Sequence, residues 1–150
     1  MSVKKLPPKD LLLPSWSDEY EEKIDLIHQQ LVRLNSSTFI LEKLFSFRFD
    51  LFTPFNQNFW ALIEQALFET CIMIVWRVGV DSHAEGLTLQ QLKKEVLHNL
   101  KDDYKEEFRR LVKGANFEKT ISSVKPTISK IRHNYIAHFN LKHTYKTNIG

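Results

Sequence analysis

The sequence predicts a single all-α domain built as an up-and-down helical bundle, and three observations support this. The 150 residues suffice for one hydrophobic core, because 43% of them are apolar and phenylalanine alone occurs 11 times. Glycine and proline number only 4 and 5, which leaves little of the turn chemistry that β architectures need. Apolar residues recur at the three- and four-residue spacing of helices through most of the chain.

The N-terminal part of this bundle is expected to be one long helix behind a short arm. Residues 1–14 contain three prolines and no periodicity, so we expect an extended arm ahead of a helical domain at 15–140. A helix is predicted from Ser15 to Ser17 onward to about Phe49. Its apolar stripe consists of Ile24, Ile27, Leu31, Leu34, Leu41 and Phe45.

The second helix is expected to begin at Thr53-Pro54, with threonine as the cap and proline in the first turn. The residues behind it are apolar on nearly every side of a helix, which predicts a central helix buried by its neighbours. The segment from Arg77 to Gly86 is expected to end this helix and to form the main loop.

The remaining helices follow from capping signals and periodicity. Thr88 and Gln91 have capping-box spacing and predict the start of a third helix. A fourth segment at 102–113 is either continuous with the third or separate. A last helical region is predicted over 117–139, where Pro126 either kinks the helix or lies in the first turn of a second piece. Residues 141–150 read as a polar tail.

Composition also restricts the class of protein. No Cys/His cluster has zinc-ligand spacing, and Cys71 is the only cysteine, so we expect no metal, no cofactor and no internal disulfide. The longest apolar segment, 59–80, is interrupted by polar residues, and no leader is recognisable, so we expect a cytoplasmic protein without a membrane span.

The positive charge is concentrated in the C-terminal part. From Lys119 to Gly150 there are six cations and no acidic residue, whereas the preceding residues are net acidic. This asymmetry favours contact with a polyanion such as RNA or DNA. The alternative is a solvated basic face with no ligand.

The residues best suited to chemistry are Arg132 and His138 in the last helical region. Arginine grips a phosphodiester through two parallel hydrogen bonds, and histidine exchanges protons near neutral pH. Together they suffice to cut RNA without a metal: the base assists attack by the 2′-hydroxyl, and the guanidinium stabilises the added negative charge.

This pattern is weak by itself, because Arg77 and His83 repeat the same spacing. Six residues of ideal helix also place Arg132 and His138 about 120° apart, so both reach one phosphate only if the helix is distorted or two copies meet. That geometry favours a homodimer with a composite cleft. Asn134 shares a face with His138 and is expected to orient the imidazole or the substrate. The alternative is an interface histidine and a surface ion pair.

The string Arg132-His133-Asn134-Tyr135-Ile136-Ala137-His138 resembles the hallmark of the HEPN superfamily, in which an arginine and a polar residue precede a histidine on the last core helix. The order of segments from about Ile24 onward is similar to the abortive-infection U branch of that superfamily. The resemblance rests on Asn56 to Trp60, Arg77 with Asp81, and the helix start at Thr88.

The resemblance implies a HEPN-like bundle, a homodimer and a metal-independent endoribonuclease that acts as a toxin or in phage defence, with a possible antitoxin or regulatory protein. It implies that Arg132 and His138 are catalytic, that His133 takes the polar position, and that Arg77 and Asp81 match a recurring pair. We favour an ion pair at the helix end for that pair over a role in the cleft.

Two departures from the branch bear on this assignment. His133-Asn134 stands where Asp-Lys is usual, so the local hydrogen bonding is expected to differ. Asn140 stands where toxins silenced by tyrosine nucleotidylation carry tyrosine. The alternative functions are a catalytically inactive HEPN-like module that binds a nucleotide, RNA or a partner protein, and a plain dimerisation scaffold.

Overall fold

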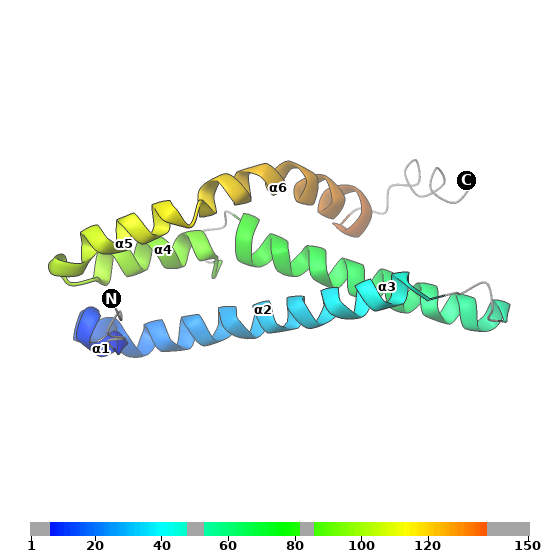
Figure 1. Cartoon of the computed structure of the whole chain (residues 1–150), viewed down its shortest axis with the longest axis horizontal. Coiled ribbons are helices and arrows are strands. Elements are labelled where there is room, and N and C mark those ends of the chain that lie inside the picture. The colour runs from blue at the N-terminus through cyan, green and yellow to red at the C-terminus, as the bar shows by residue number, and fades with distance from the viewer. Residues whose placement is uncertain (1–6, 48–52, 82–85, 138–150) are drawn as a thin grey trace.

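The computed structural model describes residues 7–47, 53–81 and 86–137, and this part of the chain is almost entirely helical. Its helices, in chain order, are α1 (Pro8–Leu11), the 3-10 turn η1 (Pro14–Trp16), α2 (Ser17–Phe45), α3 (Pro54–Val75), the π-helical turn η3 (Trp76–Val80), α4 (Leu89–Asn99), α5 (Asp102–Gly114), α6 (Phe117–Ile131) and the π-helical turn η4 (Arg132–Ala137). Figure 1 shows that α2 and α3 form a long antiparallel hairpin, with α4 and α5 at one end and α6 running back along α3. The predicted all-α, HEPN-like bundle is confirmed.

The long helix α2 contains 29 residues and begins at Ser17, within the predicted start region. It continues without a break through Thr38, whose hydroxyl donates back to the Leu34 carbonyl at 2.8 Å. Ile27, Leu41 and Leu44 are buried along the face toward α3. The helix therefore spans the whole length of the hairpin.

Helix α3 begins at the predicted position, where the Thr53 hydroxyl accepts a hydrogen bond from the Asn56 amide. The expectation that neighbours enclose this helix on all sides holds only near its C-terminal end, where Ile72 and Ile74 are buried. Phe59 and Leu62 are 51% and 66% exposed. The reason is that α2 covers one side, while α6 packs near the other end.

One described helical stretch, Asn56–Val80, is long and apolar enough to cross a membrane by length and composition alone, with a mean hydropathy of 1.4. The core helix of a soluble protein passes the same test. Since α2 packs along this stretch, we assign no clear membrane span to it.

The hydrophobic core lies where the N-terminal half of α2 meets η3 and α4. Its buried members are Leu12, Trp16, Ile27, Ile74, Val78, Leu92 and Leu100. The predicted extended arm is therefore wrong in part. Residues 8–11 are helical, and Leu12 is only 3% exposed and pairs with Leu100 in an isolated β-bridge. The sequence of the arm carries only a weak helix signal, but burial of the Leu12 and Leu100 side chains stabilises this part of the fold.

Helices α4 and α5 are separate, which resolves the open question from the sequence. The backbone is extended at Leu100 and Lys101, and this extended pair hydrogen bonds to the N-terminal arm: Lys101 N donates to Leu11 O at 2.9 Å, and Leu13 N donates to Asn99 O at 2.8 Å. The long-range bridge is thus the reason for the break.

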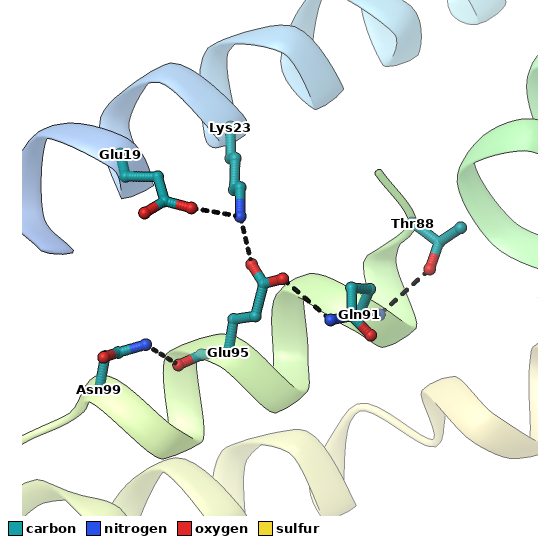
Figure 2. A network of polar contacts seen from close by, with 6 residues as sticks. All are labelled: Glu19, Lys23, Thr88, Gln91, Glu95 and Asn99. Carbon is teal, nitrogen blue, oxygen red and sulfur yellow. Dashed lines mark hydrogen bonds and ion pairs between the residues drawn. The ribbon is translucent and has the colours of Figure 1, made fainter. Parts of the chain in front are cut away.

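A polar network fixes α4 against α2 (Figure 2). The Lys23 ammonium donates to Glu95 at 2.7 Å and pairs with Glu19 at 2.6 Å. The Gln91 side-chain amide donates to the other Glu95 oxygen at 2.9 Å, while the Gln91 backbone amide donates to the Thr88 hydroxyl at 3.1 Å. The predicted cap at Thr88 is confirmed, but the Gln91 side chain binds Glu95 and does not close a capping box.

Helix α6 packs closely on η3. A Cβ built on Gly79 would lie 3.0 Å from the Cδ1 atom of Ile121, so a larger residue here would require the Ile121 side chain to shift. Pro126 lies inside α6 and does not end it. The predicted main loop from Arg77 is wrong in its first part, because the backbone stays helical through Val80. His83, His138, Asn140 and the tail at 141–150 lie outside the described residues.

Candidate functional site

The candidate site forms where the last helical segment crosses the end of α3. Arg132 is the first residue of η4, and its guanidinium carbon lies 4.8 Å from the centroid of the Trp76 ring. Such a cation–π contact contributes about 0.5–2 kcal/mol, depending on how far the charge is desolvated. The contact fixes the plane of the guanidinium, which is the group that would bind a phosphodiester.

The polar atoms of this guanidinium are incompletely satisfied. Arg132 is half-buried, and its buried Nε atom has no hydrogen-bond partner among the residues that the structure describes. No carboxylate among the described residues pairs with Arg132. A buried donor without an acceptor is rare in folded proteins, and a bound anion is a common reason for one. The surface ion pair considered as an alternative for Arg132 is not found in this part of the chain.

Both segments that meet here are π-helical. In η3 the Asp81 amide donates to the Trp76 carbonyl five residues earlier, at 2.8 Å. Arg132–Ala137 adopts the same class of turn. Single π-turns occur mainly at functional sites in helical proteins. The last helical segment is therefore distorted from Arg132 onward, and how this affects the pairing of Arg132 with His138 stays a prediction.

The other residues assigned to the last helix occupy different environments. His133 is exposed, and Asn134 is half-buried. His138 lies outside the described residues, so its pairing with Arg132 stays a prediction. The structure thus describes the arginine of the predicted pair and not its histidine.

Arg77 and Asp81 lie near Trp76 in sequence but not in the same environment as Arg132. Arg77 is exposed and lines a shallow pocket of about 380 Å³ with Arg33 of α2 and Glu69 of α3, on the side of α3 that faces α2. Asp81 is half-buried at the end of η3. The structure therefore brings Trp76, not Arg77, to Arg132, and the role of Arg77 with Asp81 stays a prediction.

Trp76 was not predicted to be a site residue. It reads as the end of an apolar run, and its contact with Arg132 joins residues far apart in the chain. The only usable hint is that an arginine predicted on an apolar helix face needs an aromatic or acidic neighbour. Among the described residues no group of three or more His, Cys, Asp or Glu could hold a metal ion.

Comparison with known proteins identifies the family of the chain. The family model HEPN_AbiU2, described as AbiU2, matches residues 17–148, which covers most of the chain. No curated protein and no solved structure matches this chain. The match includes the whole bundle from α2 to η4 and the Arg132 to His138 string. The chain therefore belongs to the AbiU2 family of HEPN proteins.

Proposed function

We propose that this protein is a metal-independent endoribonuclease that acts in the cytoplasm as a toxin or abortive-infection effector. The observation that carries the proposal is the Arg132 guanidinium, which is stacked on Trp76, lacks a carboxylate partner in the described chain and has a buried Nε without an acceptor. A phosphodiester oxygen is the acceptor that suits this planar donor. Membership of the HEPN_AbiU2 family supports a role in abortive infection.

The proposed reaction needs one base and one cation. The imidazole of His138 removes the proton from a ribose 2′-hydroxyl, and the oxygen attacks the adjacent phosphorus. Arg132 stabilises the extra negative charge on the phosphoryl oxygens as the bond from phosphorus to the 5′-oxygen breaks. The leaving 5′-oxygen takes a proton from an imidazolium or from water. The products are a 2′,3′-cyclic phosphate and a 5′-hydroxyl.

We propose that the active form is a homodimer in which two copies of the η4 segment line one cleft. The end of the α2–α3 hairpin exposes seven large apolar side chains: Phe39, Ile40, Phe45, Phe47, Phe59, Leu62 and Phe68. Soluble monomers rarely expose so many large apolar groups in one region, so a second copy is expected to cover them. The proposal that the two η4 turns share a substrate rests on the spacing of Arg132 and His138, which one ideal helix does not bring to one phosphate.

The test of the proposed function is RNA cleavage in EDTA. Purified wild-type protein is expected to cut a mixed-sequence RNA and to leave 2′,3′-cyclic phosphate ends, which a phosphatase assay that discriminates cyclic from linear phosphate detects. Arg132→Ala and His138→Ala are each expected to lower the rate at least about 100-fold, as loss of an electrostatic or acid–base group does. Trp76→Leu is expected to have a smaller effect, since it removes only the stacking partner.

The matched control is Arg77→Ala, which removes an exposed arginine from the other side of α3 and is expected to keep the rate. Absence of any cleavage by the wild type, together with RNA or nucleotide binding that survives His138→Ala, would instead assign the protein as an inactive HEPN-like binding module. The exchange of Asp-Lys for His133-Asn134 is the feature of the sequence that favours this second candidate.

A further inference from the structure

A second surface outside the Arg132 site has the properties of a ligand groove. It lies where α4, α5 and the start of α6 meet, and its volume of about 440 Å³ is within the range of small-ligand sites. Figure 1 shows that α4 and α5 lie side by side and that α6 continues from the end of α5. The groove is lined by Lys93, Lys94, Leu97, Phe108, Arg109, Val112, Lys113, Asn116, Phe117, Glu118 and Lys119.

The charge of the groove is strongly positive. Five of its lining residues are cations and one is acidic. That acid, Glu118, pairs with Lys93, and Arg109 contacts Glu106 at 3.3 Å. The three remaining cations, Lys94, Lys113 and Lys119, are exposed and pair with no carboxylate in the described chain. Like charges gathered around one concavity repel each other, so an anionic ligand would stabilise them.

The floor of the groove is apolar. Leu97, Phe108, Val112 and Phe117 lie there and are half-buried. A neighbouring apolar pocket of about 340 Å³ shares Phe108 and Phe117 with it. A ligand that fits both parts carries negative charge on one side and a flat apolar face on the other. An unpaired nucleotide has both, because its base stacks on aromatic side chains while its phosphate meets lysines.

A helix face with exposed lysines near both ends also runs from the groove along α6. Helix α6 has 15 residues, so its length is about 22 Å. Lys119 and Lys130 are eleven residues apart and therefore only about 20° apart around the helix axis. Both are exposed. Arg132 follows Lys130 by two residues and points about 160° away from it on an ideal helix, so a strand on this face must pass around the C-terminal end of α6 to reach Arg132.

We infer that the groove between α4, α5 and α6 binds a single-stranded RNA segment at a distance from the cleaved bond. This inference rests on the proposed nuclease function and adds a substrate class to it. One strand of a duplex advances about 3.4 Å per nucleotide, and an unpaired strand is more extended, so about six or seven nucleotides are the most that the 22 Å length of α6 requires. A 12-nucleotide single strand is therefore long enough to occupy both sites at once.

The experiment measures binding separately from cleavage. A fluorescent 12-nucleotide RNA with 2′-O-methyl riboses cannot be cut, because the attacking hydroxyl is blocked, and its affinity is followed by fluorescence anisotropy between 50 and 200 mM salt. The variant Lys94→Glu with Lys113→Glu is expected to bind at least about tenfold more weakly. Its plot of log affinity against log salt is expected to be shallower by about 1.4, which is 0.7 for each lost phosphate contact.

The matched control is Arg33→Glu with Arg110→Glu, which changes the charge equally at two exposed arginines that do not line the groove. It is expected to keep most of the affinity. Phe117→Leu, which preserves bulk but removes the aromatic face, is expected to weaken binding about tenfold without changing the salt slope. Circular dichroism confirms that each variant is folded.

The results separate this inference from the proposed function. Loss of affinity in the groove variant with binding retained in Arg132→Ala supports the groove, whether or not the wild type cleaves RNA. Equal losses in the groove and control variants, or none in the groove variant, overturn the inference even if the wild type cleaves RNA. A poly-glutamate chain that displaces the RNA completely and binds as tightly would assign the groove to an acidic protein and also overturn it.

Discussion

The two ends of the α2–α3 hairpin differ in how their apolar residues are used. At the closed end, where α1, η1, η3 and α4 surround the N-terminal half of α2, Leu12, Ile27 and Ile74 are each at most 3% exposed. At the projecting end, formed by the second half of α2 and the first half of α3, Phe45 and Leu62 are each 66% exposed. In Figure 1 this second end extends beyond the other labelled helices.

This difference shows that only part of the sequence's hydrophobicity serves the fold of one chain. Apolar residues at the closed end are covered by segments distant in sequence, so they stabilise the monomer. Apolar residues at the projecting end contact mainly the partner helix of the hairpin and solvent, which is typical of a surface that binds another protein. Four experiments with expected outcomes test this difference between the two ends.

The largest effect is expected from truncation at the closed end. Ile74→Ala is expected to lower the free energy of unfolding by about 2–5 kcal/mol, because it leaves a cavity in the core. Leu62→Ala at the projecting end is expected to cost less than about 0.5 kcal/mol in a dilute, monomeric sample. Urea denaturation of both variants measures the difference. Similar costs for the two would mean that the hairpin ends are equally packed in solution.

The next effect concerns self-association. Leu62→Asp combined with Phe59→Asp is expected to weaken the homodimer about 100-fold, since interface centres tolerate buried charge poorly. The control Leu111→Asp changes an equally exposed leucine, 61% accessible on α5, and is expected to leave the dimer intact. Sedimentation velocity over a concentration series distinguishes them. A wild-type chain that stays monomeric at every concentration would remove the proposed role of the projecting end.

A smaller effect is expected at the helix contact beneath the Arg132 site. Gly79→Ala is expected to destabilise the fold by about 1–3 kcal/mol, because its new Cβ would lie 3.0 Å from Ile121 Cδ1. The matched variant Gly114→Ala meets no atom within 4 Å and is expected to stabilise the protein by up to about 1 kcal/mol. Thermal melting of the two gives shifts of opposite sign. A gain in stability for Gly79→Ala would show that α6 moves away easily.

The smallest effect is a pH dependence at the closed end. Burial raises the pKa of the Glu95 carboxyl, but the hydrogen bonds from Lys23 and Gln91 outweigh it and hold that pKa below its ordinary 4.5. The hydrogen bond to Glu19, followed by that to Glu95, raises the pKa of Lys23 above 10.5. The Glu95 contribution is therefore complete above pH 4.5 and is lost as the pH falls through the lowered value. The Lys23 contribution is complete below pH 10.5 and is lost as the pH rises through the raised value.

Glu95→Gln tests this directly, because glutamine resembles the protonated carboxyl. The variant is expected to be about 1 kcal/mol less stable than the wild type at pH 7, which is typical of a partly exposed charged hydrogen bond. The stability difference is expected to shrink as the pH falls below 4.5. A difference that stays constant down to pH 2 would show that Glu95 keeps no charge-dependent contact with Lys23.

Local signals in the sequence predicted local structure well. The caps at Thr53 and Thr88 depend only on residues three positions away, and both are present. The break at Leu100 and the burial of Leu12 were not predicted, because they depend on each other across nearly ninety residues. The three- and four-residue periodicity of apolar residues does not distinguish a π-turn from an α-helix. The π-helical turns η3 and η4 were therefore not predicted either.

The candidate site could also be predicted only in part from the sequence. Residue chemistry, helix context and the family resemblance predicted Arg132 as a phosphate-binding group. Its stacking on Trp76 and its unpaired Nε depend on how α6 crosses α3, which only the three-dimensional arrangement supplies. The basic groove was visible in sequence only as part of a charge asymmetry, because its cations come from three separate helices.

The wide turn at Arg132–Ala137 also has a consequence for the register of the chain. A π-turn accommodates one residue more than an ordinary α-turn, and one residue of helix corresponds to a rotation of about 100° around the helix axis. Deleting one residue inside this turn would keep the composition almost unchanged and yet turn the following side chains toward a different face. Insertions and deletions here are therefore expected to change which side chains of the C-terminal segment lie on a given face.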